Sequence, residues 1–216
     1  MRGLIEKDLR LTLIRKQTIV IFLVMALAMG VSMNGAFIVA YLTMLAMIIG
    51  TGTLSYDEYD NGFPFLMTLP FDRKTYVREK YLFSFITAIA AWCFGAAIFG
   101  IMDVVRNNGA GLSEIPMMTA IIPSMYIASA VIIPLQLKYG GEKSRIALFI
   151  IFGLVAVVAV GAGKVIENPL NPIADVITAL QGLPGPAVLL ILVAVCVITT
   201  TVSYLFSVRI MEKKEF

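Results

Sequence analysis

The chain has 216 residues, of which 59% are hydrophobic and 14% are charged, with a formal net charge of +3 and a mean hydropathy of +0.91. Soluble domains carry about 25% charged residues, so this composition excludes an ordinary soluble domain and predicts a polytopic membrane protein. The chain contains no histidine, which removes the commonest residue of metal sites and of general-base catalysis. We therefore expect no catalytic residues, no metal site and no enzymatic activity in this chain.

The leader, residues 1–17, contains five Lys or Arg residues and places Ile5, Leu9 and Leu13 at spacings of four. A helix here would be weakly amphipathic, which is typical of a helix lying on the cytosolic membrane interface. The alternative is a solvated leader that only orients the first span. Because the leader contains Glu6 and Asp8, we do not expect it to be a cleaved signal peptide.

Six apolar runs predict an all-α fold with six transmembrane helices in a single domain, residues 1–216. The predicted spans are residues 18–33, 36–54, 81–102, 116–137, 146–163 and 187–208. Within the third span, Gly95 and Gly100 form small-xxx-small pairs with Ala91 and Ala96, which allow close helix packing. Residues 164–186 form an outer loop, and we expect its apolar piece 173–180 to re-enter the membrane.

The basic residues predict the orientation. Fifteen of the seventeen Lys and Arg residues fall in the leader, in the long loop 55–82, in a short basic loop 138–145 and after residue 208. The positive-inside rule therefore predicts that both termini and the long loop are cytosolic. Since the basic residues follow the topology and do not form one patch, we do not expect nucleic acid as a partner.

The spans carry no charged residue near their centres, which argues against an ion-coupled transporter. A glycine-rich run at residues 160–165 does not make a nucleotide site. The Walker pattern needs glycine where Val158 stands and serine or threonine where Val165 stands.

The polar loop 55–80 has an apolar centre, Phe63–Phe71, that is too short to cross a membrane. Pro64 fits the first turn of a short helix, Pro70 stops that helix, and Asp72 can cap the next one. The pattern predicts a short cytosolic helix between the second and third spans. An apolar surface held in water favours a partner protein.

The run Leu66–Arg73, with the sequence LMTLPFDR, followed by Val77–Lys80, resembles the coupling-helix loop of type-2 ABC exporter permeases, whose core reads Leu-x-x-Leu-Pro-x-x-Arg. The span layout, the basic leader and the outer loop before the last span are also similar to this family, so the resemblance covers the whole chain. It implies that this chain is the membrane subunit and that a separate cytosolic ATPase, in two copies, binds ATP and Mg²⁺. It further implies a second permease chain, either an identical copy or a paralogue. The residues that it places at the ATPase contact are Phe63, Pro64, Phe65, Leu66, Met67, Leu69, Pro70 and Arg73.

The branch most resembled is that of bacterial peptide exporters, including exporters of phenol-soluble modulin toxins. This implies a bacterial plasma membrane and an amphipathic or hydrophobic substrate, and the adaptable apolar side chains of a substrate path would be Trp92, Phe94, Met44 and Met47. The same residues would equally suit contact with lipid. The alternatives are a permease for lipids or antibiotics, and a membrane scaffold that recruits a cytosolic partner without transport.

Overall fold

The computed structural model describes every residue except 15, 33–34, 60–61, 107–110, 167–183 and 215–216. The described residues form helices and no strand, which confirms the all-α prediction for this part of the chain. The helices are α1 (Arg2–Ile14), α2 (Lys16–Ser32), α3 (Gly35–Glu58), α4 (Gly62–Met67), α5 (Arg73–Arg106), α6 (Gly111–Ile166) and α8 (Gly185–Lys213).

Among the described residues, four segments are long and apolar enough to cross a membrane, and they make this a multi-pass membrane protein. They are Phe37–Glu58, Arg73–Val105, Glu114–Gly141 and Gly185–Lys213. The first covers the predicted span 36–54 from residue 37 on, and each of the others contains one of the predicted spans. Counting the bent pair Arg2–Ile14 and Lys16–Ala28, whose axes differ by 69°, as one span would give five. The predicted span 146–163 lies on the second half of α6, and the predicted re-entrant piece 173–180 lies outside the described residues.

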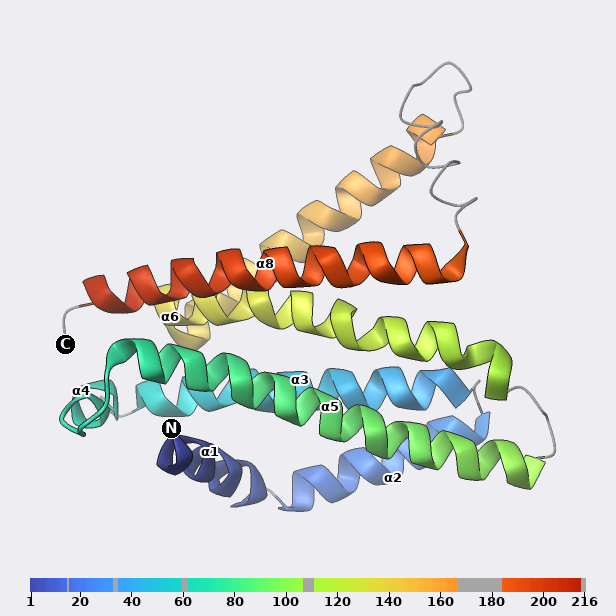
Figure 1. Cartoon of the computed structure of the whole chain (residues 1–216), viewed down its shortest axis with the longest axis horizontal. Coiled ribbons are helices and arrows are strands. Elements are labelled where there is room, and N and C mark those ends of the chain that lie inside the picture. Colours follow the sequence, from blue (N-terminus) through green and yellow to red (C-terminus); the bar gives the residue numbers. More distant parts are fainter. Residues whose placement is uncertain (15, 33–34, 60–61, 107–110, 167–183, 215–216) are drawn as a thin grey trace.

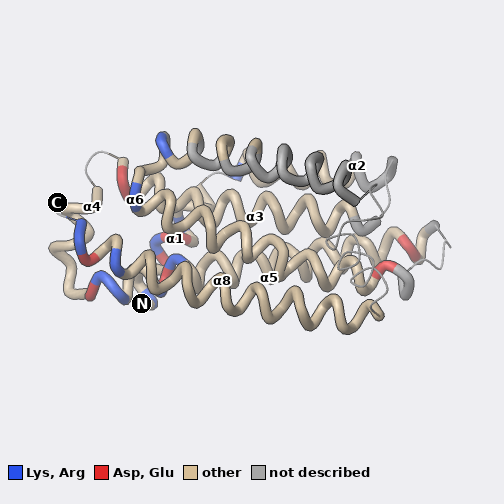
Figure 2. The backbone as a smooth tube through the Cα atoms, turned by 90° about the horizontal axis from the view of Figure 1, so that it is seen from above, with Lys and Arg blue, Asp and Glu red and all other residues tan. Residues whose placement is uncertain are grey.

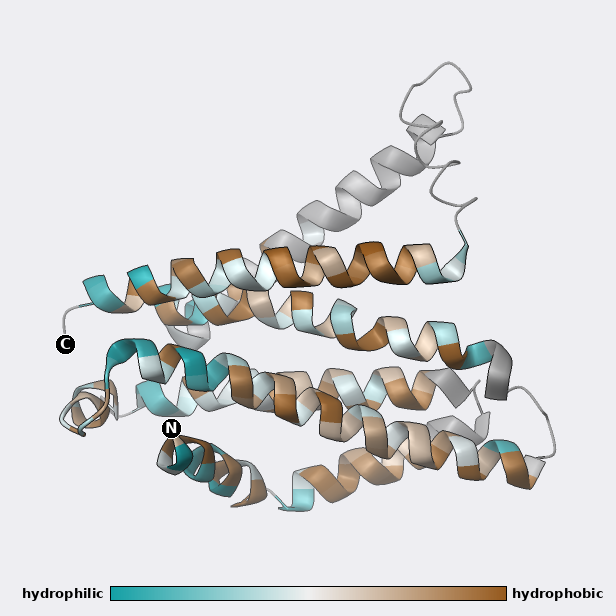
Figure 3. Cartoon of the chain, in the orientation of Figure 1, coloured by the Kyte–Doolittle hydropathy of each residue, from teal (hydrophilic) through white to brown (hydrophobic). Residues whose placement is uncertain are grey.

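The long helices run side by side along the molecule (Figure 1), with α3 packed against α5 and α6, and α6 packed against α8. Both chain ends and α4 lie at the same end of this bundle. We call this the charged end, formed by α1, the end of α3, α4, the start of α5, the part of α6 around Gly140 and the end of α8. Figure 2 shows that Lys and Arg gather there, and Figure 3 shows apolar residues filling the middle of the long helices.

The polar segment predicted as a long loop is mostly helical. α3 continues to Glu58, four residues past its predicted span, and α5 begins at Arg73, eight residues before its predicted span. At 1.5 Å per residue, the 34 residues of α5 extend roughly 51 Å, well beyond an apolar membrane core of about 30 Å. An apolar core of that thickness is too thin to cover all of α5 at once.

The basic segment 138–145 is also helical rather than a loop. α6 runs through it and breaks at Gly140, whose φ of 80° and ψ of 170° are non-helical. A positive φ combined with an extended ψ is open to glycine and strained for other residues. The chain therefore turns at the single residue Gly140, where the sequence predicts a loop of eight residues, 138–145.

Close packing of α3 against α5 depends on small residues. A Cβ atom added at Gly95 would lie 3.0 Å from the Cα atom of Val39, whereas one added at Gly100 would meet nothing within 4 Å. Gly95 therefore serves helix packing inside this chain, and Gly100 does not.

Candidate functional site

The short helix α4 has a buried face and an exposed face. Phe63 and Leu66, three residues apart, are 5% and 7% exposed, while Phe65 between them is 71% exposed. Pro64 stands in the first turn, where a missing N–H costs nothing. The helix ends at Met67, two residues earlier than predicted, and the N–H groups of Thr68 and Leu69 close a tighter last turn on the carbonyls of Phe65 and Leu66.

The buried face of α4 joins an apolar cluster to which four other helices contribute. Phe63 and Leu66 belong to one apolar cluster with residues of α3, α5, α6 and α8, namely Leu54, Tyr76, Val77, Tyr81, Ile133, Leu137 and Met211. The rings of Phe63 and Tyr76 meet edge to face with centroids 5.8 Å apart. A displacement of α4 would therefore be felt by all four helices, because packed interiors transmit strain.

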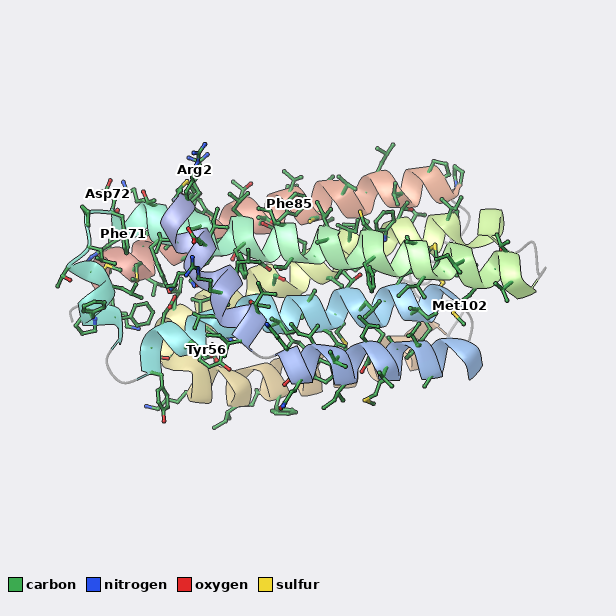
Figure 4. The ribbon with its side chains drawn as sticks, turned by 90° about the horizontal axis from the view of Figure 1, so that it is seen from below. Arg2, Tyr56, Phe71, Asp72, Phe85 and Met102 are labelled. Atoms are coloured by element: carbon green, nitrogen blue, oxygen red, sulfur yellow. The ribbon has the colours of Figure 1, made fainter. Side chains whose placement is uncertain are left out.

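The predicted ATPase-contact residues divide into three groups. Pro64, Phe65, Leu69 and Pro70 are exposed, Met67 is half-buried against the core, and Phe63 and Leu66 are buried. Arg73 turns toward the end of α8. Figure 4 shows Phe71 and Asp72 beside α4 at the charged end, and Met102 at the opposite end of the bundle.

Three basic side chains, Arg73, Lys74 and Lys214, hold the end of α8 against the start of α5, α6 and α4. Arg73 Nη1 donates to the carbonyls of Met211 and Glu212 at 3.0 and 2.8 Å, and Lys74 Nζ lies 3.4 Å from Glu212 Oε1. Lys214 Nζ donates to the Leu137 carbonyl at 3.2 Å and sits 4.6 Å from the centre of the Phe63 ring. Cations suit this position because the last carbonyls of a helix lack partners within it.

The break at Gly140 is tied to α3. The N–H of Gly141 donates to Glu58 Oε2 at 2.7 Å, and Lys214 Nζ lies 3.9 Å from Glu58 Oε1. Glu58 therefore links the last turn of α3 to the break in α6 and to the end of the chain.

A group of buried ionic and polar side chains lies between α1, α3 and α5. We call it the ion cluster. Its buried members are Asp8, Thr53, Asp57, Tyr76, Glu79 and Lys80, and the half-buried Lys7 completes it.

Lys80 is the centre of the ion cluster. Its Nζ contacts Asp8 Oδ2, lies 2.7 Å from Asp57 Oδ2 and donates to Thr53 Oγ1 at 3.1 Å. Lys7 Nζ contacts Asp57 Oδ1 and lies 3.1 Å from Asp8 Oδ1. The Tyr76 hydroxyl donates to Asp57 Oδ2 at 2.8 Å. Buried charges persist only when they are paired and hydrogen-bonded in this way.

Glu79 is the exception within the cluster. Its side chain is fully buried, its carboxylate oxygens have no hydrogen-bond partner among the described residues, and the Nζ of Lys80 is 3.9 Å away. The cluster thus brings two lysines together with three carboxyl groups.

Sequence reasoning missed the ion cluster. It treated Asp57, Glu79 and Lys80 as solvated loop residues and Asp8 as part of a leader with its own apolar face. The available signal was the pair Leu4 and Asp8, one turn apart, which are the buried residues of α1. The predicted leader residues point elsewhere: Ile5 is half-buried, and Leu9 and Leu13 are exposed.

The predicted substrate-path residues do not converge on one site. Trp92 Nε1 donates to the Met118 carbonyl at 2.8 Å, so it joins α5 to α6, and Met47 is buried. Phe94 and Met44 are exposed on the outside of the bundle.

Comparison with known proteins gives one finding for the whole chain. A family model described as "ABC-2 family transporter protein" matches residues 3–212. No match was found among curated proteins or among solved structures.

Proposed function

Because the chain belongs to the ABC-2 family of transporter proteins, we propose that it is the permease subunit of an ATP-driven exporter. A separate cytosolic ATPase would bind ATP and Mg²⁺ and perform hydrolysis, and this chain would supply no catalytic residue. The observation that carries the proposal is α4, a short helix whose buried face joins an apolar cluster shared with α3, α5, α6 and α8 and whose Phe65 is exposed.

The charged end would face the cytosol. The concentration of Lys and Arg at this end supports the orientation through the positive-inside rule. With α2 and both halves of α6 counted as spans beside α3, α5 and α8, the chain would cross the membrane six times. Both termini would then lie on the cytosolic side, next to α4.

The ATPase would bind the outward face of α4 and the residues after it: Pro64, Phe65, Leu69 and Pro70. Phe65 is the principal contact, because burying an aromatic side chain of this size contributes about 1.5–3 kcal/mol. Phe63, Leu66 and Met67 would act from beneath, by fixing α4 on the bundle. Resemblance to the family supports an assembly of two permease chains, identical or paralogous, with two ATPase subunits.

The partner is tested with Phe65→Asp in the permease purified from its native membrane in mild detergent. We expect the associated ATPase activity to fall at least tenfold while the yield of folded permease stays unchanged, since Phe65 makes no core contact. Tyr139→Asp is the matched control: it places the same charge on another exposed aromatic residue of the charged end, on α6.

Unchanged ATPase association in the Phe65→Asp permease would contradict the proposed contact. A wild-type permease that purifies with no ATPase would instead favour a membrane scaffold. Leu66→Asp should lower the yield of folded permease, because it buries a carboxylate in the cluster beneath α4.

The substrate would be amphipathic or hydrophobic, with an exported peptide favoured over a lipid or an antibiotic. The predicted spans contain no central charge to recognise an ionic solute, and Phe94 and Met44 present adaptable apolar surface at the outside of the bundle. A second permease chain packed on that surface would turn it into the wall of a path.

The substrate class is tested on the purified permease–ATPase complex in lipid vesicles. Amphipathic peptides should change the rate of ATP hydrolysis at micromolar concentration, and small hydrophilic ions at the same concentration should not. A response to the ions without a response to the peptides would rule out this substrate class.

A further inference from the structure

The attachment of α1 to the bundle is ionic at its centre. Two residues of α1 are buried, Leu4 and Asp8, and the carboxylate of Asp8 contacts Lys80 Nζ and lies 2.9 Å from Thr53 Oγ1. The exposed apolar residues of the same helix, Leu9 and Leu13, face away from this contact. α1 is therefore held at one point by charges, while its outer face suits the membrane interface.

This contact involves the two helices that flank α4 in the sequence, α3 and α5. Asp57 is in the last turn of α3, just before α4, and Lys80 is in the second turn of α5, just after it. On α1, Lys7 contacts Asp57 and Asp8 contacts Lys80. The cluster therefore ties the helix that leads into α4 and the helix that leaves it to the same turn of α1.

Tyr76 connects the ion cluster to α4 itself. Its side chain is fully buried; its ring packs edge to face on Phe63, and its hydroxyl donates to Asp57 Oδ2 at 2.8 Å. One rigid aromatic side chain thus contacts the buried face of α4 at one side and the carboxylate that pairs with Lys7 and Lys80 at the other.

The charges facing one another make this connection sensitive to small displacements. Lys7 and Asp8 come from α1, Asp57 from α3, and Glu79 and Lys80 from α5, so two cations meet three carboxyl groups. Four of these five side chains are buried, and that of Lys7 is 28% exposed. Interactions between charges in such an interior are several times stronger than in water, and they change steeply with separation. A shift of α3 relative to α5 would change the hold on α1.

We propose that Tyr76 and the ion cluster form a latch that passes movement of α4 to α1, with Tyr76 as the positioning residue between them. The latch rests on the proposed function, because the movement of α4 is attributed to the bound ATPase. It adds a moving part on the membrane surface: the leader helix is held in one nucleotide state and released in another.

The contact between α1 and the cluster is tested first on the permease alone. Leu4→Cys is introduced into a chain whose own cysteines are replaced, Cys93→Ala and Cys196→Ala, and its labelling by a membrane-impermeant maleimide is timed in lipid vesicles. Asp8→Asn should speed labelling at least tenfold and Tyr76→Phe severalfold. Glu6→Gln is the control, because Glu6 pairs with Arg10 on the exposed face of the same helix.

The transmission is tested on the permease–ATPase complex. Tyr76→Phe keeps the ring against Phe63 and removes the hydroxyl from Asp57, so we expect the ATPase to stay bound while the substrate transported per ATP hydrolysed falls severalfold. In the wild-type complex, ATP should change the labelling rate of Leu4→Cys; in Tyr76→Phe it should not. A purely structural Tyr76 would lower thermal stability and leave both of these readouts intact.

The outcomes separate the latch from the proposed function. A Tyr76→Phe complex with wild-type transport per ATP and a wild-type ATP effect on labelling would overturn the latch while leaving the permease assignment in place. If no ATPase binds the wild-type chain, the proposed function and the transmission step fall together, and the labelling of the permease alone still reports whether the cluster holds α1. Should Asp8→Asn fail to fold, Tyr76→Phe decides alone.

Discussion

At the scale of single residues, Gly140 sets the shape of the charged end. Its φ of 80° and ψ of 170° fall where side chains with a Cβ are strained. A Cβ atom added there would also lie 2.6 Å from Glu58 Oε1. Because Glu58 accepts the N–H of the next residue, Gly141, the break in α6 and the end of α3 form one contact.

Gly140→Ala should therefore lower the free energy of unfolding by about 1–3 kcal/mol, the usual cost of a non-glycine residue in such a conformation. Gly52→Ala on α3 is the matched control, since a Cβ atom there would meet nothing within 4 Å. That change should be neutral or stabilise by up to about 1 kcal/mol, because alanine favours the helix. Denaturant titration of the purified permease in detergent measures both, and equal stability of the two variants would contradict the strain argument.

The burial of the charged residues Asp57 and Lys80 could not be predicted from the sequence. The sequence predicts a solvated loop for Asp57 and Lys80, because an apolar membrane core does not accept charged side chains. What sequence could not supply is that α3 and α5 continue as helices beyond the apolar core and meet α1 there. Their side chains are then buried by protein rather than by lipid. Removing one member of such a buried ion pair typically costs about 3–5 kcal/mol.

At the scale of elements, α4 was predictable because its signals are local. Pro64 near the start and Pro70 after the end restrict the backbone whatever the rest of the chain does. Which side chains of α4 turn inward was not predictable, since Phe63, Phe65 and Leu66 are equally apolar. The division follows from the cluster of Tyr76, Val77 and Met211 beneath, which depends on helices distant in the sequence.

The sequence indicates that α5 has a face of small residues that allows close helix packing, but it does not indicate which of these residues lies at the contact with α3. Gly95 and Gly100 carry the same small-residue signal, and only Gly95 lies against a backbone. The signal identifies a face that allows close approach. The register of the two helices decides which glycine is used, and that register is fixed by contacts along their whole length.

At the scale of the whole molecule, the separation of charge between the two ends of the bundle predicts its orientation. Val105, at the far end of α5, is 80% exposed, and Lys213 is exposed at the charged end. In a chain with Cys93→Ala and Cys196→Ala, a membrane-impermeant maleimide added to intact cells should label Val105→Cys. It should label Lys213→Cys only after permeabilisation. The opposite pattern would place the charged end outside the cell and remove α4 from the reach of a cytosolic ATPase.

The ion cluster also has a consequence for the order of assembly during synthesis. Lys7 and Asp8 are made before their partners, because the partners of Asp8 stand 45 and 72 residues further along the chain, at Thr53 and Lys80. At about 5–20 residues per second, the leader waits roughly 4–14 seconds for Lys80 to be made. α1 is then made before α3 and α5 but takes its place in the bundle after them, and its charges stay in water until α5 has been made.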